Sequence, residues 1–256
     1  MSDELALKSV AIILIGNELL SGKIEDQNGH YAARRLRSLG AELGRITVIP
    51  DDEATIVAEV RRCVASFDAV ITSGGVGPTH DDITLEAIAT AYHVDTVLHP
   101  RLGTLIRGFF KDKVTDAHLR MARIPLGSEL IEVGQSTWPI VKCKTTYILP
   151  GVPEIFRAKF EAIADRFRVG QWFLRSVYLN VEEGAIAETL RRLEAVYEVS
   201  IGSYPRWRGT DYRVRVTVES RRLEPVNEAV DDFLSTIEHT ALVRVDEPLS
   251  EGTTSH

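Results

Sequence analysis

The sequence contains little cysteine and no long apolar run. Cys63 and Cys143 are the only cysteines and lie far apart, so neither a disulfide framework nor a thiolate metal site has enough ligands. We expect two buried or idle thiols. No apolar stretch approaches the ~18 residues of a membrane span, and residues 1–8 do not resemble a signal peptide. We therefore expect a cytoplasmic protein that does not bind membranes.

An excess of basic residues is also absent. The formal net charge is −7, whereas neutralising the phosphates of nucleic acid or anionic lipid requires a basic face. The seven histidines never form a closely spaced ligand pair, and only His80 falls within a candidate site. We expect no nucleic-acid partner, and His80 is either a catalytic group or an exposed loop residue.

Strand and helix patterns alternate through the first two thirds of the chain. The wholly apolar runs at 10–15 and 69–72 are typical of strands buried on both faces of a parallel sheet. The expected strands are 10–15, 45–49 and 69–72, and the expected helices are 27–39, one that begins at Asp52 or Glu53, and one that follows residue 84. Such alternation predicts an α/β fold of three layers, in which helices cover both faces of a mostly parallel sheet.

The last helix of this first domain is expected after Pro150-Gly151-Val152-Pro153, because proline suits the first turn of a helix. It carries Phe156, Phe160, Ile163 and Phe167 on one apolar face. Beyond it we expect strands at 174–181, 199–204, 212–220 and 241–245 and helices at 185–197 and 224–238. The predicted organisation is an α/β domain at 8–170, a small α+β domain at 171–246 and a tail at 247–256.

A glycine-rich segment is the main candidate for a functional loop. Residues 72–84 read Thr-Ser-Gly-Gly-Val-Gly-Pro-Thr-His-Asp-Asp-Ile-Thr and follow an expected buried strand. Its three glycines allow backbone N–H groups to approach an anion, and the N-terminus of the following helix adds partial positive charge. The segment contains neither a Walker lysine nor the dinucleotide-binding pattern. We expect it to bind a phosphate or pyrophosphate.

Two acidic residues end this segment. Asp81 and Asp82 would repel a bound phosphate unless a divalent cation lay between the carboxylates and the phosphate oxygens. The alternative is that both carboxylates cap the following helix. The residues alone leave both possibilities open.

Several motifs resemble those of the molybdopterin-binding-like superfamily. Gly-Gly-Val-Gly-Pro-Thr at 74–79, followed by Asp-Asp-Ile-Thr, is similar to its signature. Gly-Asn-Glu-Leu-Leu at 16–20 resembles the Gly-Thr-Glu-Leu-Leu of its first loop, and Leu-Pro-Gly-Val-Pro-Glu at 149–154 resembles a late motif. The chain resembles the competence-damage-inducible A proteins, and it is most similar to the molybdopterin-binding-like domain of eukaryotic FAD synthases. Gly-Ser-Tyr-Pro at 202–205 extends the likeness to the molybdopterin-binding-like part of eukaryotic FAD synthases.

This resemblance implies an activity and a set of site residues. In molybdopterin adenylyltransferases the positions that match Asp51 and Asp82 are associated with metal and catalysis. In the other branches it implies hydrolysis of a dinucleotide pyrophosphate, such as ADP-ribose or FAD, assisted by a divalent cation (Mg²⁺, Mn²⁺ or Co²⁺). The expected metal ligands are Glu18, Asp51, Asp81 and Asp82. The expected phosphate- or nucleotide-binding residues are Gly16, Ser73, Gly74, Gly75, Gly77, Pro78, Thr79, Thr84, Pro150, Gly151 and Tyr204.

Two segments depart from the family pattern. His-Leu-Arg-Met-Ala at 118–122 stands where many relatives have Asn-Arg-x-Gln-Ala, and Gln-Ser-Thr-Trp-Pro at 135–139 replaces Gly-Thr-Ala-Pro-Gly. The substrate of those relatives is therefore not carried over. Three functions remain open: a metal-dependent nucleotide pyrophosphatase with catalytic Asp51 and Asp82, molybdopterin binding or adenylyl transfer, and a non-catalytic nucleotide-binding module.

A phosphorylated nucleotide or a pterin is the expected partner, and the resemblance makes a homo-oligomer the expected assembly. The segment Tyr-Pro-Arg-Trp-Arg at 204–208 has two interpretations. It either stacks against a ring such as adenine or isoalloxazine, or forms an ordinary loop with an aromatic anchor.

Overall fold

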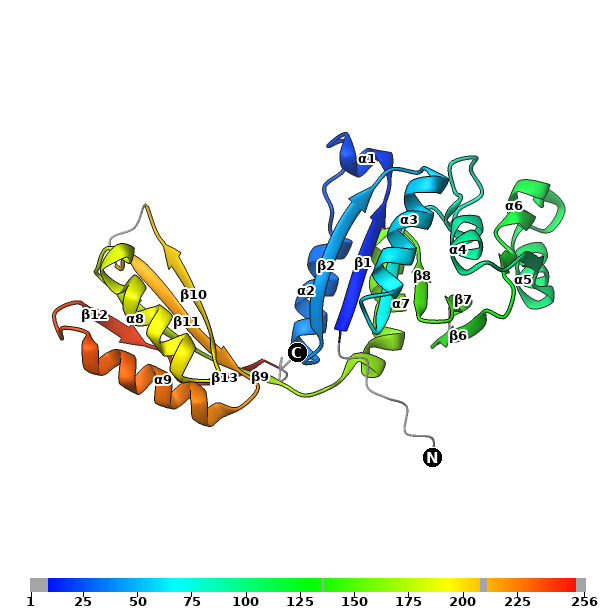
Figure 1. The fold of residues 1–256 in the computed structure, drawn as a ribbon. Coiled ribbons are helices and arrows are strands. Elements are labelled where there is room, and N and C mark those ends of the chain that lie inside the picture. The colour runs from blue at the N-terminus through cyan, green and yellow to red at the C-terminus, as the bar shows by residue number, and fades with distance from the viewer. Residues whose placement is uncertain (1–8, 135, 208–210, 252–256) are drawn as a thin grey trace, which may run out of the picture. The chain divides into compact units, whose positions relative to one another are not determined.

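The computed structural model describes residues 9–134, 136–207 and 211–251, so that residues 1–8, Gln135, residues 208–210 with Arg208 among them, and residues 252–256 lie outside the described residues. The chain forms two compact units, divided between Val169 and Gly170. The first unit is α/β and the second is α+β (Figure 1).

A six-stranded sheet forms the centre of the first unit. Its strands, in spatial order, are β2 (Glu42–Ile49), β1 (Ser9–Ile15), β3 (Ala69–Ser73), β8 (Thr146–Leu149), β7 (Ser136–Cys143) and β6 (Glu129–Val133). The first four strands run parallel, whereas β7 and β6 are antiparallel to their neighbours. The expected mostly parallel sheet is confirmed, and its carboxyl-terminal edge receives the ends of four strands.

Helices cover both faces of this sheet. Those of the first unit are α1 (Asn17–Leu20), α2 (Asn28–Ser38), α3 (Glu53–Val64), α4 (Thr84–Tyr92), α5 (Pro100–Phe110), α6 (Asp116–Arg120) and α7 (Pro153–Ile163), with short 3-10 turns at Lys111–Lys113 and Ala164–Phe167. Side chains of α2 and α7 form one core cluster, and those of α3, α4 and α5 form the other. A two-stranded sheet, β4 (Thr96–Leu98) and β5 (Arg123–Pro125), completes the unit.

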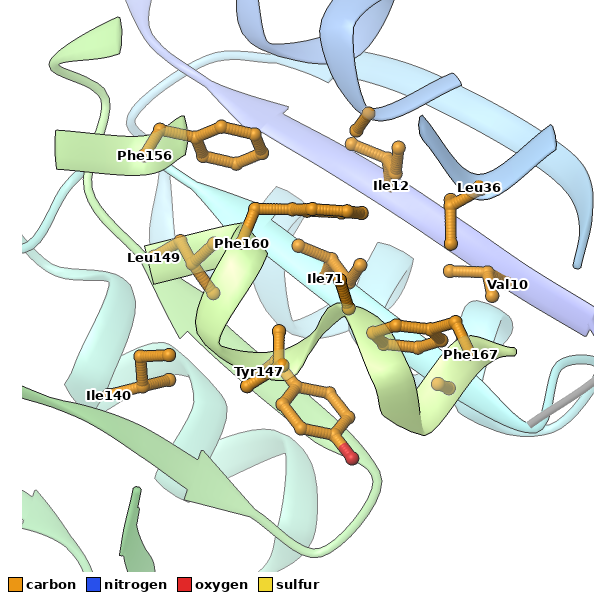
Figure 2. Close-up of a cluster of buried hydrophobic side chains, with 14 of the residues drawn as sticks. Val10, Ile12, Leu36, Ile71, Ile140, Tyr147, Leu149, Phe156, Phe160 and Phe167 are labelled. Carbon is orange, nitrogen blue, oxygen red and sulfur yellow. The ribbon is translucent and has the colours of Figure 1, made fainter. Parts of the chain in front are cut away.

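The position of β1 inside the sheet explains why its sequence is apolar at every position instead of alternating. Val10, Ile12 and Leu14 belong to the cluster on the α2 and α7 side, and the residues between them belong to the opposite cluster. Figure 2 shows Phe156, Phe160 and Phe167 beside Val10 and Ile12 in the first of these clusters. The apolar face predicted for the helix after Pro153 is therefore confirmed, because all of its expected residues are buried.

The second unit is a single antiparallel sheet with two helices. Along the chain it contains β9 (Trp172–Leu179), α8 (Glu183–Val196), β10 (Ser200–Pro205), β11 (Val214–Ser220), α9 (Leu223–Thr236), β12 (Leu242–Val245) and β13 (Leu249–Glu251). The spatial order is β10-β11-β9-β12, and β13 also pairs with β9. Val214, Val216 and Val218 are buried, as their alternation predicts. Tyr212 precedes the strand instead of opening it.

Two expectations from the composition can be compared with the structure. Cys63 and Cys143 are both free and buried, so the expectation of buried thiols is confirmed. Along the described parts of the chain, no helix combines the length and apolar character that crossing a membrane requires.

Candidate functional site

The ends of four parallel strands meet around one cavity in the first unit. Register places Ile15 beside Ile49, Leu14 beside Ser73, and Ser73 beside Leu149, so the loops that follow β1, β2, β3 and β8 leave the same edge of the sheet. The cavity has a volume of about 790 Å³. Residues of all four loops line it, together with residues of α7 and β7. This is where an open α/β sheet binds ligands.

The glycines of the loop after β3 are required by its close packing on the strand ends. Gly74 has a φ of +107°, and a Cβ there would lie 2.1 Å from the carbonyl oxygen of Ile15. Gly75 has a φ of +65°, and its Cβ would lie 2.2 Å from the hydroxyl oxygen of Thr84. The N–H of Gly74 donates to the carbonyl of Leu149 at 3.1 Å. That N–H is therefore used within the fold, unlike the role expected from the sequence.

The N–H groups of the next three residues in this loop differ from that of Gly74 in their hydrogen bonding. Among the described residues, no hydrogen bond uses the N–H of Gly75, Val76 or Gly77. All three residues line the cavity, and α4 begins a few residues later. Successive backbone N–H groups without a partner are able to donate to one anion.

Asp81 and Asp82 share the side chain of Thr79. The Thr79 hydroxyl oxygen lies 2.5 Å from a carboxylate oxygen of each, and the Thr79 N–H donates to Asp82 at 2.8 Å. One hydroxyl proton can satisfy only one of these two contacts. The hydroxyl of Thr79 lowers the pKa of Asp81 below its usual value. The first residues of α4 receive no side-chain cap, so the alternative that both carboxylates cap this helix is wrong.

Asp51 and Glu18 line the same cavity from the loops after β2 and β1. The carboxylate of Asp51 accepts a hydrogen bond from the N–H of Asn17 at 2.8 Å. The carboxylate of Glu18 folds back over Gly16, where a Cβ would lie 2.4 Å from it. Within residues 9–134, 136–207 and 211–251, no three His, Cys, Asp or Glu side chains are grouped so that they could hold a metal ion. The four expected ligands thus share a cavity without forming a closed cluster.

Asn28, the first residue of α2, connects two of the loops and was missed by the sequence prediction. Its side chain is only 5% exposed, and its amide nitrogen donates to the hydroxyl of Ser73 at 2.9 Å and to the carbonyl of Gly151 at 2.7 Å. The hydroxyl of Ser73 lies 3.3 Å from the carbonyl of Pro150. Asp26 fixes this end of α2, because its carboxylate accepts from the N–H groups of Asn28 and Gly29. Ser73, Pro150 and Gly151 are therefore held together as expected for one site.

Lys159 on α7 was also missed. It lines the cavity, and its ammonium donates to the carbonyl of Pro139 at 2.7 Å. Burial lowers the pKa of this ammonium to about 8. The cavity also has an apolar part of its lining, which includes Leu102, Met121, Trp138, Val141 and Ile148. Met121 and Trp138 come from the two segments that depart from the family pattern, so these departures alter the cavity itself.

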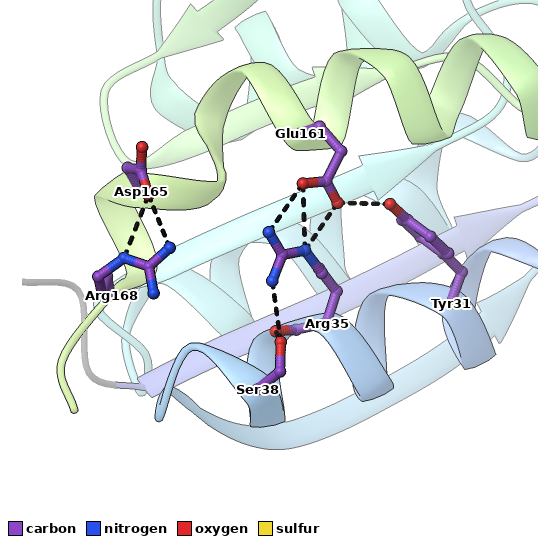
Figure 3. Close-up of polar contacts among 6 residues, drawn as sticks. All are labelled: Tyr31, Arg35, Ser38, Glu161, Asp165 and Arg168. Atoms are coloured by element: carbon purple, nitrogen blue, oxygen red, sulfur yellow. Dashed lines mark hydrogen bonds and ion pairs between the residues drawn. The ribbon is translucent and has the colours of Figure 1, made fainter. Parts of the chain in front are cut away.

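The helices that carry Asn28 and Lys159 are joined by a polar cluster (Figure 3). Glu161 on α7 accepts hydrogen bonds from the Tyr31 hydroxyl at 2.5 Å and from the Arg35 guanidinium at 2.8 and 2.9 Å, both on α2. Burial, together with the Glu161 carboxylate, raises the pKa of Tyr31 to about 12. This cluster fixes the spacing of α2 and α7 beside the cavity.

Some expected site residues lie elsewhere. Thr84 is buried, and its hydroxyl donates to the carbonyl of Gly74 at 3.0 Å, so it stabilises the loop without lining the cavity. Gly16 and Pro78 adjoin lining residues without lining the cavity themselves. His80 is an exposed loop residue, with 98% of its side chain accessible. Tyr204 belongs to the second unit, where it is half exposed and the Arg215 guanidinium lies 4.9 Å from its ring centre.

Comparison with known proteins assigns both units. The family model "Probable molybdopterin binding domain" matches residues 11–168, and the model "FAD synthase, middle domain" matches residues 171–246. A protein of Archaeoglobus fulgidus is 34% identical, over 87% of this chain and 95% of its own length. The "Probable FAD synthase" of Caenorhabditis briggsae is 29% identical over 89% of this chain, which spans only 50% of that relative.

A solved structure supports the same assignment. The protein CinA of Thermoplasma acidophilum, whose function is described as unknown, matches 63% of this chain and 99% of its own length, with 30% identity and a TM-score of 0.58. The resemblance seen in the sequence motifs is therefore confirmed. The chain belongs to the family described as "Probable molybdopterin binding domain", and its second unit matches the middle domain of FAD synthases.

Proposed function

We propose that this chain is a divalent-metal-dependent nucleotide pyrophosphatase that acts on a dinucleotide such as FAD or ADP-ribose. The observation that carries the proposal is the juxtaposition of two features in one cavity wall. The N–H groups of Gly75, Val76 and Gly77 supply unpartnered donors for a phosphate, and Asp81 and Asp82 supply carboxylates in the same loop. Donors for phosphate oxygens beside carboxylates for a cation suit metal-assisted phosphoryl chemistry.

The residues present fit a divalent cation. Asp81 and Asp82 meet at the Thr79 hydroxyl, which has one proton for two carboxylates, so negative charge accumulates there. Mg²⁺ commonly takes one or two carboxylates and completes its coordination with water and substrate phosphate, so a closed protein cluster is not required. Asp81 and Asp82 would hold the ion, with Glu18 and Asp51 facing the same cavity. When bound, Mg²⁺, Mn²⁺ or Co²⁺ would neutralise charge on the phosphate oxygens.

The reaction is a hydrolysis. Water forms the new bond to one phosphorus, the bridging phosphorus–oxygen bond breaks, and two monophosphates leave, AMP being one of them for FAD and ADP-ribose. The N–H groups of residues 75–77 hold the oxygens of the attacked phosphate, whose charge increases in the transition state. The apolar wall formed by Leu102, Met121 and Trp138 accommodates a flat ring.

Chromatography of the products tests this function. The purified chain is incubated separately with FAD, ADP-ribose and NAD, each with Mg²⁺, Mn²⁺ or Co²⁺ and with a chelator as the metal-free control. We expect AMP release that requires metal and is lost in Asp82→Asn. The control Asp165→Asn, an exposed carboxylate paired with Arg168, should retain turnover. Intact dinucleotides with every metal would refute the proposal.

A second function is favoured by the family match itself. The model that covers residues 11–168 describes a molybdopterin-binding domain, and the same loop and apolar wall suit a phosphorylated pterin. The two enzymes differ in their need for a second substrate. A pyrophosphatase requires only water, whereas a molybdopterin adenylyltransferase consumes ATP only when molybdopterin is present. Saturable nucleotide binding without turnover under either condition would identify a binding module instead.

A further inference from the structure

Most of the charged side chains that line the cavity are acidic. They are Glu18, Glu25, Asp26, Asp51, Asp81, Asp82 and Lys159. Six carboxylates thus face one ammonium, counted over the described residues. An anionic ligand in this cavity is repelled by most of the wall, so a single protein cation has a large influence on where the ligand's negative charge can lie.

Lys159 has no acidic partner. Its ammonium makes one hydrogen bond, to the carbonyl of Pro139, and no carboxylate of the described residues lies within the 4.0 Å of an ion pair. An ammonium has three donors, so two of them have no partner in the part of the chain that the structure describes. Burial alone lowers its pKa, and no charged neighbour contributes to that shift. A half-buried, unpaired charge is costly for the fold, so a ligand oxygen that completes its hydrogen bonds is favoured.

Lys159 and the anion-binding loop line the same cavity. The Lys159 ammonium is held at the carbonyl of Pro139 in β7, and β7 pairs with β8 as far as Val141 and Ile148. The loop that follows β8 touches the glycine loop, because a Cβ on Gly151 would lie 3.4 Å from the Cα of Gly74. Lys159 and the glycine loop are therefore connected through the neighbouring strands β7 and β8.

We propose that Lys159 binds a second anionic group of the ligand, so that the cavity selects two linked phosphates over a single phosphate. In this arrangement the N–H groups of residues 75–77 hold one phosphate and the Lys159 ammonium holds the next. The inference deepens the proposed pyrophosphatase and rests on the same anion-binding loop. It concerns ligand recognition and can be tested without turnover.

Calorimetric titration with ADP and AMP tests the selection, because these ligands differ by one phosphate. Each is titrated into the full chain in chelator and again in Mg²⁺. We expect Lys159→Met to weaken ADP binding about 10- to 100-fold, the range for a lost charge-assisted hydrogen bond, and to change AMP binding little. Lys144→Met is the matched control. It removes the same charge from the turn at the other end of the β7–β8 hairpin, where Lys144 lies over the Tyr92 ring.

The outcomes separate this inference from the proposed enzyme. Equal weakening of ADP and AMP, unchanged ADP binding, or no ADP binding by the wild type in either buffer would overturn the inference. If Lys159→Met does not fold, Lys159→Gln and Lys159→Arg provide the comparison, since Arg retains the charge and should retain the preference for ADP. Lys159-dependent ADP binding without any dinucleotide hydrolysis would refute the pyrophosphatase and leave the inference intact.

The pH dependence of ADP-ribose affinity distinguishes a lysine that binds the ligand from one that has only a structural role. The phosphates of ADP-ribose stay ionised from neutral to alkaline pH, so its affinity reports on the protein. We expect wild-type affinity to fall as the pH rises through and above 8, because the Lys159 ammonium then loses its proton. The affinity of Lys159→Arg for ADP-ribose should stay constant over this pH range. Lys159→Gln measures any dependence that comes from the six carboxylates, and a wild-type profile identical to that of Lys159→Gln would contradict the inference.

Discussion

The amide nitrogen of Asn28 lies 2.9 Å from the hydroxyl oxygen of Ser73 and 2.7 Å from the carbonyl oxygen of Gly151. One side chain at the start of α2 therefore fixes the spacing between the loop after β3 and the loop before α7. Both amide hydrogens are used, which also fixes the orientation of the amide group. The remaining carbonyl oxygen of Asn28 is buried without a partner, so the amide is held entirely by these two donated bonds.

Asn28→Ala should destabilise the protein and weaken ligand binding together. The change removes two hydrogen bonds of a buried side chain and leaves the hydroxyl of Ser73 and the carbonyl of Gly151 without this donor, so we expect unfolding to become easier by about 2 to 4 kcal/mol. Urea denaturation measures the stability, and titration with ADP measures binding. Asn17→Ala, an exposed side chain at the start of α1, is the control and should change the unfolding free energy by less than about 0.5 kcal/mol. Equal stabilities of the two variants would contradict the role of Asn28.

Gly74→Ala should damage the site more than an alanine at a glycine of similar conformation. The new methyl group would lie 2.1 Å from the carbonyl oxygen of Ile15, so β1 and the glycine loop must separate. Gly127 also has a positive φ, +81°, with open space around its Cβ position. We expect about 1 kcal/mol of strain for Gly127→Ala and about 3 kcal/mol or more for Gly74→Ala. Thermal unfolding compares them, and similar losses would show that backbone conformation alone requires Gly74.

The sequence was most informative where one local pattern determines one environment. The apolar run of β1 predicted a strand buried on both faces, and the structure divides its side chains between two clusters. The spacing of Phe156, Phe160 and Ile163 predicted one face of α7 in the same way. The segment between α4 and β8 gave no such pattern. Several of its helices and strands have only three to five residues, and their burial is decided by the rest of the fold.

The glycine loop was recognised from its composition, but the sequence did not predict which groups its glycines contact. Gly74 approaches Ile15, which lies about 60 positions earlier, and no local pattern encodes such a contact. Asn28 and Lys159 were missed for the same reason. An asparagine at the start of a helix suggests only a local turn, and a lysine on an amphipathic helix suggests a solvated face. Only the tertiary fold brings their side chains to the cavity.

Tyr31, in the polar cluster between α2 and α7, should lose its proton at a higher pH than an ordinary tyrosine. The pKa of Tyr31 is raised from 10.0 to about 12, first by burial and then by the Glu161 carboxylate. A group whose pKa is raised on folding stabilises the fold below its unfolded pKa, so this contribution should disappear between pH 10 and about 12. The ultraviolet absorbance of phenolate, compared with Tyr31→Phe, locates the transition.

Glu161→Gln separates the two causes. It removes the negative charge and retains an oxygen that can accept from the Tyr31 hydroxyl, so the pKa of Tyr31 should move part of the way toward 10.0. Because burial is the larger cause, a complete return is not expected. A transition that stays near 12 in Glu161→Gln would show that the carboxylate does not act on Tyr31. Asp165→Asn, on the turn that follows α7, is the matched control and should leave the transition in place.

Lys159→Met should stabilise the fold while it impairs binding. Burial lowers the pKa of this lysine from 10.5 to about 8, so the unfolded chain binds the proton more tightly than the folded one. Removing the charge should therefore raise the unfolding free energy near pH 7 by about 1 to 3 kcal/mol, after allowing for the lost hydrogen bond to Pro139. The wild type should gain stability between pH 8 and 10.5, and the variant should not. Urea denaturation at pH 7 and near pH 10.5 measures this difference, which should shrink as the lysine loses its proton. A variant less stable than the wild type at neutral pH would mean that the lysine contributes to the fold, and the argument that its charge is kept for a ligand would lose its support.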